Sequence, residues 1–268
     1  MSTWPLTTHG SPQKPACVLL HGWLGSGKDW DTVMVSLAQS FFCVAVDLPG
    51  HGSHPLPEDS SSITFPNLAD DLHRSLLPIL GERPFALVGY SMGGRLALRY
   101  ALQYPQSLTA LVLENCQPGL TDKTARMERK LLDVKRAETI LSQGLSRFLE
   151  SWYSASLFQS LRKDQARFQN LLHQRMSNKA KSVARMLRDL SPGTQEPVWS
   201  HLPQLQTRTM LLTGRLDPKY PSLLAKVHEQ LPQSTLCEIE DAGHNVHWEA
   251  PEAWLNHVTS FLLEHQVS

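Results

Sequence analysis

This chain of 268 residues lacks long apolar runs, net charge and metal-like cysteine spacing, and each absence excludes a kind of protein or site. No apolar run approaches the roughly 18 residues that cross a bilayer, so we expect no membrane-spanning segment. Lys and Arg together number 25, as do Asp and Glu, and this balance leaves no overall field that would attract nucleic acid or a membrane surface. The 4 cysteines lack metal-ligand spacing, so no metal site is expected.

The cysteines lie in or beside apolar, strand-like runs, which is typical of small buried residues in a reducing cytoplasm. Their spacing alone leaves a disulfide open. Residues 1–15 lack the basic start and apolar core of a secretory signal. We therefore expect a cytoplasmic protein, working as a monomer, whose length suits one large domain or a domain with an insertion. The cysteines are Cys17, Cys43, Cys116 and Cys237.

One stretch near the middle of the chain organises the rest. The apolar run Phe85–Val88 predicts a buried strand, and it is followed by Gly89, Ser91 and Gly93 in the pattern Gly-x-Ser-x-Gly. A helical pattern comes directly afterwards. Strand, Gly-x-Ser-x-Gly and helix together resemble the nucleophile elbow of the α/β-hydrolases. There the serine stands above the sheet, and the amide of the next residue, here Met92, helps to hold an oxyanion.

Strands and helices alternate on both sides of this stretch. The alternation favours a mostly parallel central sheet with helices on both faces. The resemblance of the elbow implies that this is an α/β-hydrolase fold, in which an inserted helical segment forms a lid. The residues before Cys17 are too poor in strand-like sequence to place the first one or two strands. The predicted strands are Cys17–Leu20, Phe42–Val46, Phe85–Val88, Leu108–Leu113, Thr209–Thr213 and Thr235–Ile239, and the helices include Asp29–Leu37, Leu68–Leu80 and Trp254–Leu263.

The alternation stops between Leu113 and Thr209, where helical patterns cover Ala125–Ile140 and Arg162–Leu190. We therefore predict a core domain of residues 1–116 and 206–268 and a helical lid of residues 117–205. The lid carries 15 Lys and Arg against 8 Asp and Glu, so the neutral total hides a basic lid on an acidic core. Most of these charges are expected on solvated helix faces, and a few pointing inward would suit an anionic substrate.

Ser91, Asp217 and His244 follow predicted strands in the chain order of the α/β-hydrolase triad. A histidine can take the serine proton near neutral pH, and a carboxylate on its other ring nitrogen fixes the tautomer. The alternatives are a helix cap for Asp217, which precedes a proline, and a turn residue for His244. His247 is the rival histidine, and His51, in a turn of its own, is expected to be structural.

The first strand runs into His21-Gly22-Trp23, a sequence similar to the oxyanion loop of the same fold. This resemblance implies that the backbone amide of Trp23 is the second oxyanion donor beside that of Met92. A plain strand-to-helix turn with a buried tryptophan is the other interpretation.

Seven motifs between Val18 and Pro251 together resemble one family, the 2-succinyl-6-hydroxy-2,4-cyclohexadiene-1-carboxylate synthases of bacterial menaquinone biosynthesis. The lid segments and Arg95 discriminate this family from other α/β-hydrolases. The motifs are Asp47–Gly52, Gly89–Arg95, Gln117–Leu120, Arg126–Arg129, Ser151–Tyr153, Asp217–Tyr220 and Gly243–His247.

The resemblance implies a lyase without a metal or organic cofactor, acting on a small substrate with three carboxylates. The triad would abstract a proton beside a succinyl carbonyl, and pyruvate would leave. Arg95, Arg129 and Arg175 match carboxylate-binding arginines of the family, although Arg175 aligns only with about two residues inserted before it. Asn115-Cys116 departs from the small residues expected there, which affects the pocket wall. Tyr90, Trp152 and Tyr153 match residues that line the pocket.

Two other functions use the same residues. A carboxylester or thioester hydrolase would have the same triad and a different pocket. A receptor would keep the fold without turnover, which the complete triad and the elbow glycines disfavour.

Overall fold

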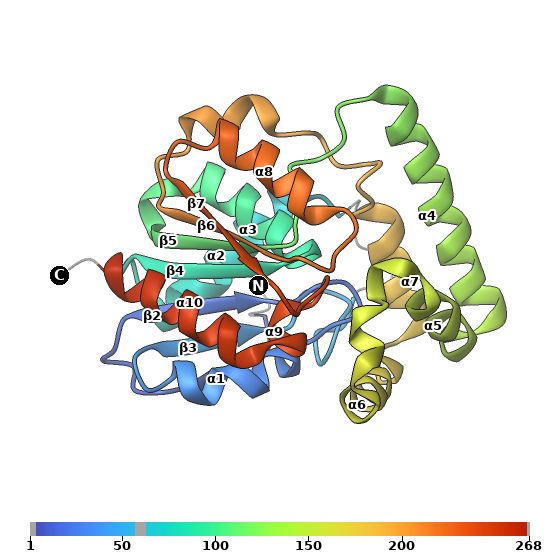
Figure 1. Ribbon diagram of the computed structural model, residues 1–268, viewed down its shortest axis with the longest axis horizontal. Helices are drawn as coiled ribbons and strands as arrows, with labels where there is room; N and C mark the ends of the chain where they lie inside the picture. Colours follow the sequence, from blue (N-terminus) through green and yellow to red (C-terminus); the bar gives the residue numbers. More distant parts are fainter. Residues whose placement is uncertain (1–3, 57–62, 267–268) are drawn as a thin grey trace.

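The computed structural model describes residues 4–56 and 63–266, which are organised around a seven-stranded sheet (Figure 1). The spatial order is β1-β3-β2-β4-β5-β6-β7, in which β1 runs antiparallel to β3 and all other neighbours are parallel. The predicted mostly parallel sheet is confirmed. The strands are β1 (Leu6–His9), β2 (Ala16–Leu20), β3 (Phe42–Val46), β4 (Phe85–Tyr90), β5 (Leu108–Glu114), β6 (Thr209–Gly214) and β7 (Ser234–Ile239).

Side chains alternate along each central strand, so the two faces of the sheet carry separate apolar cores. Val18 and Leu20 of β2 point to the face covered by α2, α3 and α8, whereas Cys17 and Leu19 point to the face covered by α1 and α10 (Figure 1). All four cysteine thiols are free, which answers the question that their spacing left open. The covering helices are α1 (Asp31–Leu37), α2 (Phe65–Leu80), α3 (Met92–Gln103), α8 (Tyr220–Gln230) and α10 (Pro251–Glu264).

Helix α2 begins three residues before its predicted start because of its cap. The Thr64 hydroxyl accepts the Asn67 amide proton, and Pro66 occupies the first turn, where no intrahelical N–H is needed. Pro78 does not end the helix, which continues to Leu80 and stops at Gly81 with φ +63°. The N-terminal side of α2 thereby reaches the carboxyl edge of the sheet.

Residues 117–205, between β5 and β6, form only helices and turns, and most of them pack at one end of the sheet (Figure 1). Their apolar cluster includes Leu24 and Trp248 of the sheet-bearing part, so it rests on the loops at the carboxyl ends of the strands. The pattern over Arg162–Leu190 is divided by a break at residues 177–179. The main helices are α4 (Lys123–Gln143), α5 (Leu145–Ser154), α6 (Gln165–Met176) and α7 (Ala180–Asp189), with a 3-10 turn at Trp199–Gln204.

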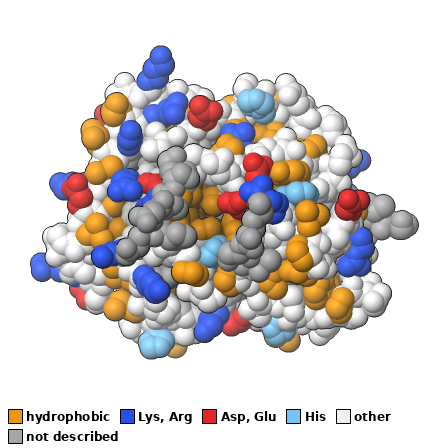
Figure 2. All heavy atoms as spheres, turned by 180° about the vertical axis from the view of Figure 1, so that it is seen from behind, with side chains coloured by type: hydrophobic (Ala, Val, Ile, Leu, Met, Phe, Trp, Pro, Cys, Tyr) orange, Lys and Arg blue, Asp and Glu red, His pale blue; other side chains and the backbone are white. Residues whose placement is uncertain are grey.

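Charge is distributed unevenly between these two parts. Figure 2 shows Lys and Arg side chains gathered toward the left of the view, the side on which residues 117–205 lie. In the described ranges 4–56 and 63–266, no helix is both long and apolar enough to cross a bilayer.

Candidate active site

The turn between β4 and α3 places Ser91 in a conformation that few non-glycine residues adopt, with φ +52° and ψ −105°. The turn requires glycine at two positions because a side chain would not fit there. A Cβ on Gly89 would lie 2.5 Å from the Gly93 carbonyl oxygen, and one on Gly93 would lie 2.3 Å from the Leu20 carbonyl oxygen. The sharp turn therefore fits closely against β2 and lifts the Ser91 side chain above the carboxyl edge of the sheet.

Ser91, His244 and Asp217 form a continuous hydrogen-bonded series. The Ser91 Oγ lies 3.3 Å from His244 Nε2, and His244 Nδ1 lies 2.7 Å from Asp217 Oδ2. The other carboxylate oxygen of Asp217 accepts the backbone N–H groups of Lys219 (2.7 Å) and Tyr220 (2.9 Å) at the start of α8. Asp217 thus contacts the histidine and also accepts two backbone amides near the start of α8, whose N-cap is Lys219.

The same contacts explain the ionisation of Asp217. Burial would raise the pKa of this carboxyl, but the hydrogen bond and charge of His244 and the two backbone amides hold the pKa below its usual range. A carboxylate that accepts from Nδ1–H fixes the neutral tautomer of His244, with Nε2 free to accept the Ser91 proton.

The loop that carries His244 is anchored by two side chains to which the sequence analysis gave no role in the site. Asn115, with φ +44° directly after β5, donates from its amide to the carbonyls of Gly243 (3.1 Å) and His244 (2.7 Å). Glu249 accepts the backbone N–H groups of Gly243 (2.9 Å) and Asn245 (3.0 Å). Asn115, where small residues were expected, therefore holds the histidine loop in place through its side-chain amide.

The two other candidate histidines lie in different surroundings. His247 has Nδ1 at 2.9 Å from Glu114 and stacks on Trp30 with ring centroids 4.2 Å apart. His51 donates from Nδ1 to the Pro49 carbonyl, and burial lowers its pKa to about 3. Both rings are buried, and neither lines the cavity that contains Ser91.

Two backbone N–H groups stand beside Ser91 without an acceptor. Within the described part of the chain, no oxygen accepts from the amide of Trp23 or Met92. A Cβ on Gly22 would lie 3.5 Å from the Ser91 Cβ, so the loop before Trp23 passes directly over the serine. The Trp23 indole donates to the Val183 carbonyl at 3.0 Å, which ties this loop to α7. The role of these two amides as oxyanion donors stays a prediction.

Ser91 opens into a cavity of about 340 Å³ between the sheet edge and residues 117–205. None of its described lining residues is Asp or Glu, whereas four are cationic. Among the described residues, no cluster of three His, Cys, Asp or Glu side chains could hold a metal ion. All the residues that we assigned to the site by side chain, apart from Asp217 behind His244, line this cavity. They are Tyr90, Ser91, Arg95, Arg129, Trp152, Tyr153, Arg175 and His244, joined by Gln117 and Lys219, which we had not assigned.

The four cations differ in how far their charge is compensated. Arg175 is buried, and its guanidinium forms a two-fold ion pair with the buried Asp29 at 2.6 and 2.7 Å. Its Nε donates to the Tyr153 hydroxyl at 3.3 Å. Arg129 donates to Asp133 at 2.7 Å and stays partly exposed. The assignment of Arg175 as a substrate ligand remains a prediction, and the structure adds that its charge is already neutralised.

Arg95 and Lys219 have no carboxylate partner among the described residues. Arg95 is buried, and it donates to the Leu190 carbonyl (2.9 Å) and to Gln195 Oε1 (3.0 Å), which are both neutral acceptors. Burial lowers its pKa to about 10. Partial desolvation, together with the nearby Arg129 and Arg95, also lowers the pKa of Lys219, although Asp217 opposes this shift and the side chain is exposed at the surface. A bound anion would favour the charged form of both side chains.

Comparisons with known proteins agree on the fold. A profile of the α/β-hydrolase fold matches residues 15–251. A Pectobacterium atrosepticum 2-succinyl-6-hydroxy-2,4-cyclohexadiene-1-carboxylate synthase is 33% identical over 260 residues, which cover 95% of this chain and 97% of that protein. The structure of MenH from S. aureus superimposes with a TM-score of 0.93 at 28% identity and covers both chains completely.

A plant relative is much longer. The chloroplastic protein PHYLLO of Arabidopsis thaliana is 34% identical over 250 residues, which are 87% of this chain but 14% of the plant protein. The chain therefore corresponds to one part of that larger protein.

The packing of the elbow makes a specific prediction. Gly93→Ala should lower the free energy of unfolding by about 1–3 kcal/mol or more, because the new methyl group meets backbone oxygens that cannot rotate away. Gly27→Ala is the matched control, since the nearest atom to its Cβ lies at 3.4 Å. Urea denaturation of both variants checks this, and equal stability of Gly93→Ala and the wild type would contradict the described turn.

The Asp29–Arg175 pair predicts a dependence of stability on pH. Burial would raise the pKa of Asp29, but Arg175 holds it below its ordinary value of 3.8. The pair's contribution is therefore complete above about pH 4 and is lost as the pH falls through the lower native pKa. Asp29→Asn should cost about 3–5 kcal/mol at pH 7 and should flatten the acid limb of the unfolding curve. Asp31→Asn, whose carboxyl has a raised pKa, should not flatten it.

Proposed function

Because the chain belongs to the 2-succinyl-6-hydroxy-2,4-cyclohexadiene-1-carboxylate synthases, a family of enzymes with the α/β-hydrolase fold, we propose that it catalyses this step of menaquinone biosynthesis as a lyase. The substrate would be the corresponding cyclohexene carboxylate with a succinyl group and an enolpyruvyl ether. The reaction would release pyruvate and leave a conjugated diene in the ring.

The observation that carries this proposal is the charge of the cavity beside Ser91. Arg95, Arg129, Arg175 and Lys219 line it, and no described carboxylate does. A substrate with three carboxylates supplies the missing negative charge. Arg95 is the clearest case, because it is buried with neutral acceptors only. A charge-assisted hydrogen bond to a substrate carboxylate would offset the cost of burying it.

In the proposed mechanism, His244 accepts the Ser91 proton through Nε2, and the Ser91 oxygen removes the proton beside the succinyl carbonyl. The electrons of the broken C–H bond form an enolate. The amides of Trp23 and Met92 would stabilise its oxygen, as they would a tetrahedral oxyanion in a hydrolase. The enolate electrons then move through the ring double bond and break the bond to the enolpyruvyl oxygen. The proton returns to the departing enolpyruvate, which becomes pyruvate.

Residues 117–205 are proposed to act as a lid on a core of residues 1–116 and 206–268. This segment contributes Arg129, Trp152, Tyr153 and Arg175 to the cavity wall. Because it carries 15 Lys and Arg against 8 Asp and Glu, it would attract an anionic substrate toward the opening. We propose that the protein works as a cytoplasmic monomer.

The test of this function is pyruvate release. The wild-type protein should form pyruvate from the enolpyruvyl substrate and should turn over nitrophenyl acetate poorly, without an acyl group on Ser91. Ser91→Ala should lose about four to six orders of magnitude in rate, and adding His244→Ala should cost little more because the two act in one step. His228→Ala, an exposed histidine outside the site, is the control. Rapid ester hydrolysis without pyruvate formation would favour a hydrolase. Binding of the enolpyruvyl substrate without turnover would favour a receptor.

The cations supply a second prediction. Arg95→Ala and Arg129→Ala should each lower kcat/KM by roughly tenfold to 150-fold, the worth of a charge-assisted hydrogen bond of about 1.5–3 kcal/mol. Lysine should rescue poorly where the contact is two-fold. Arg175→Ala should also lower stability, because it leaves Asp29 unpaired. Arg147→Ala, exposed on α5 and outside the cavity lining, should change kcat/KM less than about twofold.

These measurements are best made at low and high ionic strength, because salt weakens the capture of a multiply charged substrate. If alanine at both Arg95 and Arg129 changes kcat/KM by less than about threefold, the substrate is not a tricarboxylate.

A further inference from the structure

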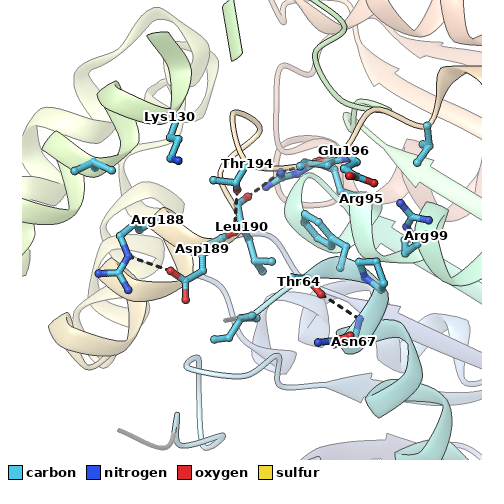
Figure 3. Close-up of a pocket in the computed structure, with 16 residues that line it drawn as sticks. Thr64, Asn67, Arg95, Arg99, Lys130, Arg188, Asp189, Leu190, Thr194 and Glu196 are labelled. Carbon is cyan, nitrogen blue, oxygen red and sulfur yellow. Dashed lines mark hydrogen bonds and ion pairs between the residues drawn. The ribbon is translucent and has the colours of Figure 1, made fainter. Parts of the chain in front are cut away.

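A second and larger cavity, of about 730 Å³, lies next to the active-site cavity and has no part in the proposed reaction (Figure 3). Its walls come from the N-terminal end of α2, from α3, from α4, and from the last turn of α7 and the residues after it. They combine apolar and polar side chains. The apolar ones are Ile63, Phe65, Pro66, Val134, Leu190 and Val198, and the polar uncharged ones are Thr64, Asn67, Thr194 and Gln195.

The charged lining of this second cavity is mainly positive. Arg95, Arg99, Lys130 and Arg188 face two carboxylates, Asp189 and Glu196. Asp189 already forms ion pairs with Arg188, at 3.0 Å, and with Arg185, at 3.3 Å. Figure 3 shows Glu196 on the side of Arg99 and Lys130 on the opposite wall. Within the described residues, no ion pair forms at either Arg99 or Lys130, so at least two cations of this wall lack a close counter-charge.

Arg95 connects the two cavities. Arg95 and Leu190 line both of them, and the hydrogen bond from Arg95 to the Leu190 carbonyl forms part of the partition. The Arg95 guanidinium lies 4.8 Å from the centroid of the Phe65 ring, which belongs to the second cavity. Only 9% of Arg95 is exposed, and its hydrogen-bond acceptors are neutral. One buried positive charge is thus shared by two adjoining cavities.

We propose that the second cavity is a binding site for an organic carboxylate with an apolar body. Arg99, one turn after Arg95 on α3, would hold the carboxylate, Lys130 on the opposite wall would add to the positive potential, and the body would contact Phe65, Val134 and Val198. The cavity volume, about twice that of the active-site cavity, has room for two linked rings. A strictly inorganic anion would leave the apolar wall unused, and an uncharged apolar molecule would leave the cations uncompensated.

Occupation of this site would weaken substrate binding in the active site. An anion beside Arg95 partly neutralises the charge that Arg95 presents to a substrate carboxylate, and the two bound anions repel each other. The coupling is reciprocal, so substrate would weaken binding in the second cavity by the same factor. This second statement rests on the proposed function, whereas the existence of the site does not.

The site is tested by titration calorimetry with biphenyl-4-carboxylate and with its neutral match, biphenyl-4-carboxamide. The wild-type protein should bind the carboxylate at least about tenfold more tightly than the amide, the worth of one charge-assisted contact. Arg99→Gln/Lys130→Gln should weaken carboxylate binding about tenfold or more. Glutamine keeps much of each side-chain stem, and thermal unfolding of the variant verifies that it is folded.

Two controls locate the probe. Lys135→Gln changes an exposed cation on the same helix as Lys130 but outside the cavity lining, and it should leave binding within about twofold. Arg129→Gln alters only the active-site cavity and should also leave binding of the probe within about twofold of the wild type. Equal binding of carboxylate and amide would overturn the proposal. So would loss of binding in Arg129→Gln with none in Arg99→Gln/Lys130→Gln, because the probe would then occupy the active site.

The coupling is measured separately. Saturating probe should raise the KM for the enolpyruvyl substrate about fivefold or more, and Arg99→Gln/Lys130→Gln should abolish this effect. An unchanged KM with the probe bound would contradict the role of Arg95. A protein that binds the probe but forms no pyruvate would instead contradict the proposed function and leave the second site standing.

Discussion

The left-handed conformation of Ser91 at the end of β4 is the constraint on which the site depends. It is held because the turn has no room for a side chain at Gly89 or Gly93. The turn directs the serine oxygen out of the sheet, frees the amide of Met92, and sets the direction of α3. Arg95, one turn further along α3, is thereby carried into the partition between two cavities. The backbone conformation of this turn therefore determines the positions of Ser91, the Met92 amide and Arg95.

Charge then decides what such a site can accept. The serine, histidine and aspartate would suit a neutral ester as well as a proton abstraction, so they do not select the substrate. We propose that the four cations of the cavity, and the absence of described carboxylates from its lining, select the substrate. Asp29 neutralises Arg175 from behind, whereas Arg95 and Lys219 keep their charge in a buried or crowded environment. Substrate selectivity would thus come from both parts of the chain, from Arg95 and Lys219 of the core and from Arg129 of the lid.

Much of the fold could be predicted from the sequence, because the central strands are short apolar runs bounded by glycine and proline. β1 escaped prediction because Leu6–His9 is largely polar and exposed, and it is held by antiparallel pairing with β3. Ser91, Asp217 and His244 could be chosen because each follows a strand, and the structure brings them together. The pairing of Asp29 with Arg175 could not be predicted from the sequence, because 146 residues separate the two and no local pattern indicates the contact. Asn115 and Lys219 likewise acquire their roles only through tertiary contacts, although a polar residue after β5 was a usable signal.

The central claim is that Ser91 and His244 remove a carbon-bound proton so that the ether oxygen leaves with pyruvate. The most direct measurement is the reaction in ¹⁸O-labelled water, with the pyruvate reduced at once to lactate to prevent exchange. Elimination breaks the bond between ring carbon and ether oxygen, so the lactate should carry unlabelled oxygen at its hydroxyl. Attack of water on the enolpyruvyl carbon would introduce ¹⁸O at that position, and labelled lactate would contradict the account.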